Sequence, residues 1–123
     1  MITGIQDVYY NVRDMKRAVD FYTGALGLKV VFGDEYWTSL DCGGVRVGLH
    51  GTGGGPVPPV PRDPHGAHAG ATLTLRSSDI AEDRRRLERA GAKILGAADE
   101  PWGEMLVIED PDGNVLKLMK PKP

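Results

Sequence analysis

The feature that most constrains the fold is an internal repeat, in which a strand is followed by a helix and three further strands, twice over. Asp14 and Asp79, each placed to cap a helix N-terminus, lie 65 residues apart. Gly27 and Gly91, each placed to end that helix, lie 64 residues apart. Between each capping aspartate and the glycine that ends its helix, apolar residues recur at helical spacing, and the segments on either side have strand character. The pattern predicts an α+β fold built from two βαβββ modules.

The expected strands and helices have definite bounds. In the first copy a helix follows Asp14, and the strands span residues 5–12, 28–32, 36–41 and 45–50. In the second copy the capping box Asp79-x-x-Glu82 opens a helix, and the strands span residues 71–76, 92–95, 104–109 and 115–120. The predicted organisation is one domain, 1–123, with module one at 1–50, a Gly/Pro-rich linker at 51–69 and module two at 70–120.

Composition and charge restrict the class of protein. With 26% charged residues and a net charge of −2, the chain suits a globular domain and not a general nucleic-acid binder. Cys42 is the single cysteine, which excludes an internal disulfide and a cysteine metal cluster. The first residues show no basic segment followed by an apolar run, and no apolar stretch reaches membrane-spanning length. We therefore expect a cytoplasmic protein with no membrane partner.

Strand alternation separates an apolar face from a mixed face. In the first strand Asp7 and Tyr9 alternate with Val8, and in the last strand Lys117 alternates with a leucine on either side. Helices need the apolar faces, so the mixed faces line a cleft or meet solvent. Lys117 is then either a lysine on a solvated face or an anion-binding or acid–base group in a cleft, where Asp7 could pair with it.

Two segments resemble signatures of the vicinal oxygen chelate superfamily, which includes glyoxalase I, extradiol dioxygenases, fosfomycin-resistance enzymes and bleomycin-resistance proteins. "VRDMKRAVDFYTGALGLKV" is similar to the first helix signature of that family, and "EDPDGNVLKL" is similar to its final hairpin. The resemblance covers essentially the whole chain. It implies two βαβββ modules whose sheets form an open barrel-like cleft, a ligand inside that cleft, and a homodimer.

The resemblance also implies four inward positions that hold a divalent ion in metal-dependent members. In this sequence they are Asp7, Gly48, Thr72 and Lys117. Glycine offers no side-chain ligand, threonine is a poor ligand, and a protonated lysine repels a cation, so we expect no glyoxalase-type or dioxygenase-type metal site. His50 shares the alternation of Gly48, but together with Asp7 it supplies only two good ligands.

Aromatic and histidine side chains complete the candidate site. The candidate ligand-binding residues are Asp7, Tyr9, Trp37, His50, Thr72, Trp102 and Lys117. The aromatic members suit the wall of a binding site, with simple packing as the alternative. His50 is either a ligand or proton-transfer group, or a plain strand-end histidine. His65 and His68 could form a metal pair, or lie exposed in the linker.

Aromatic walls without a metal site favour a metal-independent small-molecule binding protein, with an aromatic or antibiotic-like ligand and no cofactor. The alternative is a metal-dependent enzyme of the same superfamily, a lyase, isomerase or dioxygenase that holds a divalent metal through Asp7, His50 and one further residue. A third reading uses Lys117 and Asp7 as acid–base groups without a metal. The expected partners are the small molecule and a second copy of the chain, whose modules pair within one chain or swap between chains.

Overall fold

The computed structural model describes residues 1, 3–59 and 71–123. The chain divides into two compact units, a first unit of Met1–Val57 and a second unit of Pro58–Pro123. The expected metal pair, His65 and His68, lies outside the described residues, as does much of the expected linker.

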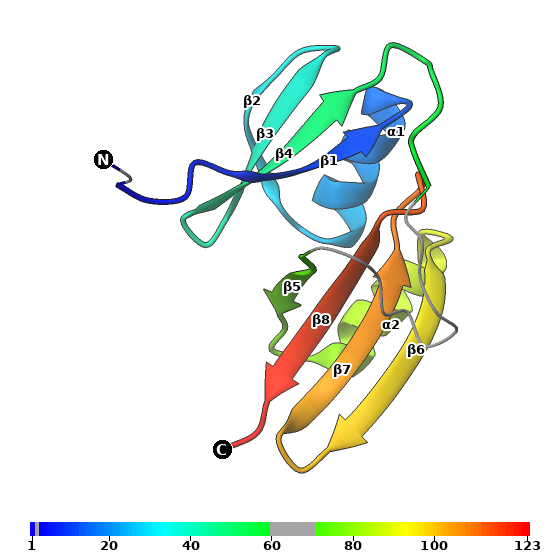
Figure 1. The fold of residues 1–123 in the computed structure, drawn as a ribbon. Helices are drawn as coiled ribbons and strands as arrows, with labels where there is room; N and C mark the ends of the chain where they lie inside the picture. The colour runs from blue at the N-terminus through cyan, green and yellow to red at the C-terminus, as the bar shows by residue number, and fades with distance from the viewer. Residues whose placement is uncertain (2, 60–70) are drawn as a thin grey trace. The chain divides into compact units, whose positions relative to one another are not determined.

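The first unit is a four-stranded sheet with a helical segment against one face (Figure 1). Its strands are β1 (Val8–Val12), β2 (Lys29–Gly33), β3 (Trp37–Cys42) and β4 (Val45–Gly51), in the spatial order β1-β4-β3-β2. β1 and β4 run parallel, whereas the other neighbours run antiparallel. The helical segment, α1 (Met15–Asp20) followed by η1 (Phe21–Ala25), connects β1 to β2.

Local chemistry defines the ends of this helical segment, as the sequence predicted. The backbone of Asp14 is extended, and its Oδ1 accepts a hydrogen bond from the Arg17 amide at 3.1 Å. Gly27, with φ 74°, follows the last turn in the left-handed conformation that glycine adopts without strain. The β3–β4 hairpin uses the same property, since Gly43 and Gly44 both have positive φ.

The sequence predicted one uninterrupted α-helix after Asp14, but the segment widens into a π-helix. The Leu26 amide donates to the Phe21 carbonyl five residues back, at 3.2 Å. The wider turn places two consecutive large side chains in the core, because Phe21 and Tyr22 are 7% and 0% exposed and their rings meet edge to face at 5.5 Å. Burial of each such side chain stabilises the fold by about 1.5–3 kcal/mol.

The second unit repeats the plan with its own sheet and helix (Figure 1). Its elements are β5 (Leu73–Arg76), α2 (Ile80–Arg89), β6 (Lys93–Glu100), β7 (Gly103–Glu109) and β8 (Val115–Pro121), in the sheet order β5-β8-β7-β6. Leu87 of α2 and the leucines and isoleucine at 106, 108 and 116 are fully buried. β6 is longer than the predicted 92–95, because it pairs with β7 along its full length although "GAADE" carries little strand propensity of its own.

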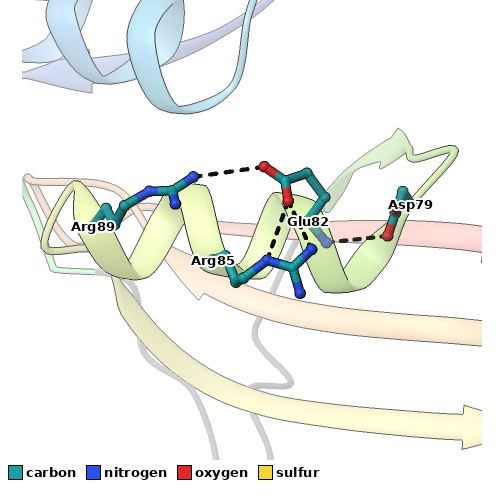
Figure 2. A network of polar contacts seen from close by, with 4 residues as sticks. All are labelled: Asp79, Glu82, Arg85 and Arg89. Atoms are coloured by element: carbon teal, nitrogen blue, oxygen red, sulfur yellow. Dashed lines mark hydrogen bonds and ion pairs between the residues drawn. The ribbon is translucent and has the colours of Figure 1, made fainter.

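Helix α2 begins at its predicted cap, but the capping box is only half formed (Figure 2). Asp79 Oδ1 accepts from the Glu82 amide at 3.1 Å, and the Asp79 amide donates to Ser77 Oγ instead of to Glu82. The Glu82 carboxylate accepts from Arg85 at 2.7 Å and lies 3.6 Å from Arg89. The hydrogen bond and charge of Arg85 lower the pKa of Glu82, but the network is exposed and stabilises the helix only weakly.

The turn at Asp110–Asn114 is tied together by side chains. Asp110 Oδ1 accepts from the Asp112 and Asn114 amides at 2.8 and 2.9 Å, and Asp110 Oδ2 accepts from Asn114 Nδ2 at 2.8 Å. Asp110 and Asn114 are 5% and 4% exposed, so these bonds lie inside the protein, and Gly113 supplies the positive φ of the turn. The turn fixes the register of β7 against β8, which positions Lys117.

The predicted α+β class and the two βαβββ modules are confirmed. Among the described residues each sheet is open, with β1 and β2 at the edges of the first and β5 and β6 at the edges of the second. No helix in the described ranges is long and apolar enough to cross a membrane.

Candidate functional site

The first sheet has two chemically different faces. On the face packed against α1, Val47 and Leu49 of β4 are fully buried. Because side chains alternate along a strand, Arg46, Gly48 and His50 of the same strand lie on the opposite face. We call this second face the open face. The first-strand prediction holds there too, since Tyr9 is 53% exposed on it whereas Val12 is buried on the other.

Two adjacent rows of residues cross the open face. Backbone pairing aligns one row as Tyr9, Gly48 and Ser39, on β1, β4 and β3. The next row is Asn11, His50 and Trp37, on the same three strands. The strand order β1-β4-β3 therefore brings three sequence-predicted site residues together from positions 9, 37 and 50, which are far apart in the chain (Figure 1).

The side chains of these rows form a cluster of three rings, Tyr9, Trp37 and His50. The Tyr9 and Trp37 rings are edge to face, with centroids 5.4 Å apart and planes at 63°. His50 lies 6.0 Å from Tyr9 and 6.3 Å from Trp37. These spacings are those of favourable aromatic pairs, which contribute about 0.5–1.5 kcal/mol each beyond the area they bury. The rings support one another on a face that remains open to solvent.

Gly48 lies directly beneath the Trp37 indole of the ring cluster. A Cβ at this position would lie 2.4 Å from Cζ2 and Cη2 of Trp37 and 2.9 Å from Cβ of Tyr9. The indole of Trp37 therefore occupies the space that any other side chain at 48 would need. The start of β3 is held as well, because the Trp37 amide donates to Asp34 Oδ1 at 2.9 Å.

His50 makes a directed hydrogen bond across to β1. Its Nδ1 lies 3.0 Å from Oδ1 of Asn11, and a carbonyl oxygen can only accept. Nδ1 is therefore the donor in this contact, and the tautomer that carries its hydrogen there leaves Nε2 as an acceptor. Because His50 is exposed, a ligand on the open face can reach this ring.

A charged pair lies one row further along the open face, and strand alternation places the Cys42 thiol on the opposite face. Arg46 Nη1 is 3.6 Å from Asp41 Oδ1, and both side chains are partly exposed, so the pair is weak. Burial, followed by the negative charge of Asp41, raises the pKa of the neighbouring Cys42 thiol. A thiol with a raised pKa is a poor nucleophile at neutral pH, so this arrangement does not suit cysteine chemistry.

The remaining candidates divide between the units. Asp7 is half-buried directly before β1. In the second unit, Thr72 is half-buried before β5, and Lys117 is half-buried on the face of β8 opposite Leu116. Among the described residues the side chain of Lys117 makes no hydrogen bond or ion pair. Asp7 and Lys117 belong to different units, and their pairing stays a prediction.

Trp102 lies in the turn between β6 and β7 and is 51% exposed. Its neighbour Gly103 pairs with Pro121, four residues along β8 from Lys117. At a rise of about 3.3 Å per residue, that separation is roughly 13 Å along the strand. The second unit thus places Trp102 and Lys117 in separate parts of its sheet.

The donor set does not fit a divalent metal ion. The ligand position at Gly48 is filled by the Trp37 indole, and the positions at Thr72 and Lys117 carry side chains that hold metals poorly or not at all. Within residues 1, 3–59 and 71–123, no group of three or more histidine, cysteine, aspartate or glutamate side chains could hold a metal. The rings, the amide and the imidazole on the open face are suited to stacking and hydrogen bonding.

Sequence reasoning missed two members of the site. Gly48 was considered only as a ligand position, although a glycine inside a strand is itself a sign that another group approaches the backbone closely. Asn11 shares the alternation of Tyr9, and that placement could have marked it as a polar member of the open face. Its hydrogen bond to His50 depends on strand order and could not be read from the sequence.

Comparison with known proteins gives a consistent result. Residues 4–118 match the family described as the Glyoxalase/Bleomycin resistance protein/Dioxygenase superfamily. TnmS3, an antibiotic binding protein from Streptomyces sp. CB03234, is 28% identical with a TM-score of 0.72, and 98% of each chain is covered. FosX, a fosfomycin resistance protein from Listeria monocytogenes, is 12% identical with a TM-score of 0.78, covering 99% of this chain and 96% of that one. Lactoylglutathione lyase from Agrobacterium tumefaciens is 22% identical with a TM-score of 0.70, covering 97% and 94%.

Proposed function

The chain belongs to the Glyoxalase/Bleomycin resistance protein/Dioxygenase superfamily, and from that premise we propose that it binds a flat aromatic small molecule without a metal ion. The observation that carries this proposal is the cluster of Tyr9, Trp37 and His50 above Gly48 on the open face. A flat ligand laid against these rings buries apolar area on both sides of the contact, at about 25 cal/mol per Å².

The names of two structural relatives support a small-molecule ligand. TnmS3 is an antibiotic binding protein, and FosX is a fosfomycin resistance protein. Sequestration of a small molecule needs a complementary face and no reactive group, whereas catalysis needs positioned acids, bases or metals. The open face offers rings, an amide and an imidazole, so binding is the better-supported role.

The absence of a metal requirement is the part of the proposal that separates it from a superfamily enzyme. It rests on the residues at the four positions that hold a divalent ion in metal-dependent members of the superfamily, because Asp7 alone among them is a good ligand. Elemental analysis of dialysed protein should find less than stoichiometric zinc, iron, manganese and nickel. One equivalent of any of these, lost in the variant Asp7→Ala, would establish the metal-dependent alternative.

Lys117, in the second unit, is proposed separately as an anion-binding group. It is half-buried and, among the described residues, has no carboxylate partner, so its ammonium group is available to a ligand. A carboxylate, phenolate or enolate on the ligand is the group it would favour. Asp7 and Trp102 remain candidate ligand-binding residues, each proposed within its own unit on its alternation or loop position.

Binding can be tested with flat aromatic antibiotics, using the anthracycline daunorubicin as the first probe in a calorimetric titration. Trp37→Ala should weaken binding by about 2- to 13-fold, which corresponds to the loss of one ring contact of about 0.5–1.5 kcal/mol. Tyr36→Ala is the matched control, since Tyr36 is exposed, adjacent in sequence and outside the ring cluster. Equal effects of the two substitutions, or no binding across a panel of such antibiotics, would refute the proposal.

A further inference from the structure

The strongest unexplained feature of the open face is the hydrogen bond between His50 and Asn11. A strand-end histidine on an exposed face has no structural need for a fixed tautomer, because water can satisfy both ring nitrogens. Here Asn11 Oδ1 holds the hydrogen on Nδ1 at 3.0 Å and leaves Nε2 as an acceptor. The His50 ring also lies next to the rings of Tyr9 and Trp37, with angles of 74° and 52° between the ring planes.

We propose that His50 is a specificity-determining hydrogen-bond acceptor, oriented by Asn11, that selects aromatic ligands bearing a phenolic hydroxyl. This inference rests on the proposed function, since it assigns a ligand class to the same open face. Tyr9 and Trp37 select the flat ring, and Nε2 of His50 accepts the hydroxyl hydrogen at the edge of that ring. Asn11 acts as a positioning residue, because it determines which nitrogen is the acceptor.

A phenol suits this acceptor better than other ring substituents. Its hydroxyl is a stronger donor than an aliphatic hydroxyl, because a phenol ionises near pH 10. A methyl ether of the same ring has the same flat body but no hydrogen to donate, so it would leave Nε2 unpaired beneath the ligand. A buried acceptor without a partner is costly, and this cost provides the discrimination.

The test compares 2-naphthol with its methyl ether, 2-methoxynaphthalene, by equilibrium dialysis against the complete chain. At about pH 8 the naphthol should bind about 5- to 10-fold more tightly than the ether, the value of one net hydrogen bond. The preference should disappear in His50→Phe, which keeps a ring, and partly persist in His50→Gln, whose amide oxygen accepts.

Nitrogen NMR gives a readout that does not depend on a ligand. In the free protein at about pH 8, the His50 signals, identified by their loss in His50→Phe, should show a hydrogen on Nδ1 and none on Nε2. Asn11→Leu should remove that tautomer preference and lower the naphthol selectivity. A hydrogen on Nε2 in the native protein would overturn the inference.

The outcomes separate this inference from the proposed function. Equal binding of naphthol and ether at about pH 8, or a preference that survives in His50→Phe, would overturn the role of His50 and leave aromatic binding intact. Failure of both probes to bind would refute the proposed function and the inference with it.

Discussion

The substitution Gly48→Ala tests most directly whether the Trp37 indole occupies the space next to Gly48. The added Cβ would lie 2.4 Å from two atoms of the Trp37 indole and 2.9 Å from Cβ of Tyr9. Carbon atoms pack best at about 3.5–4.0 Å, so the indole must move by roughly 1 Å or leave the cluster. Overpacking of this kind costs about 1–3 kcal/mol. Because the open face adjoins solvent, the indole can swing outwards, and we expect the lower half of that range.

Urea unfolding with a double-mutant cycle measures this cost. Gly48→Ala should lower the free energy of unfolding by about 1–2 kcal/mol in the native background. In a Trp37→Ala background most of the penalty should vanish, which gives a coupling free energy of at least about 0.5 kcal/mol. Gly96→Ala is the matched control, since Gly96 is also a strand glycine but its Cβ would meet nothing within 4 Å. That substitution should be neutral or stabilising by up to about 1 kcal/mol.

Two results would refute the reasoning about Gly48. The first is an equal cost of Gly48→Ala with and without the Trp37 indole, which would mean that the two positions do not compete for space. The second is daunorubicin binding that is unaffected by Gly48→Ala, because displacement of the indole must disturb a site built on it.

Three further predictions follow from other parts of the molecule. Lys117→Met should weaken the binding of anionic ligands by about 1.5–3 kcal/mol in a titration, and it should leave the binding of neutral ligands and the free energy of unfolding unchanged. Equal effects on the binding of both ligand types would contradict this prediction. The chain should be a homodimer by light scattering, because Phe32 is 58% exposed on β2, a strand at the edge of the first sheet that a partner would cover. A monomer at tens of micromolar, well above a Kd of about 1 μM, would exclude this. Asp110→Ala should cost at least about 3 kcal/mol in urea unfolding, because it leaves several buried donors of the β7–β8 turn unpaired. Asp112→Asn, at the half-buried neighbour, keeps the Asp110 acceptors and should cost far less, and equal costs of the two substitutions would argue against the network.

Sequence alone carried the information that is encoded locally. The caps at Asp14 and Asp79, the glycines that end both helices and the Asp110–Asn114 turn act through residues a few positions away, so their spacing was sufficient to predict two βαβββ modules. Strand alternation likewise placed Tyr9 on the face opposite Val12, as the structure confirms. The resemblance of two segments to a known superfamily is confirmed by the match over residues 4–118.

Tertiary structure decided what depends on several strands at once. The π-helical turn after Asp20 follows from the need to bury two adjacent rings, and the length of β6 follows from its pairing with β7, not from its own residues. In the sequence, Trp37 was a candidate for the wall of a binding site, and Gly48 was a separate position that offers no side-chain metal ligand. The strand order β1-β4-β3 makes them one feature, because a side chain from one strand fills the space above a glycine on the next, and that competition for volume has no signature in either strand alone.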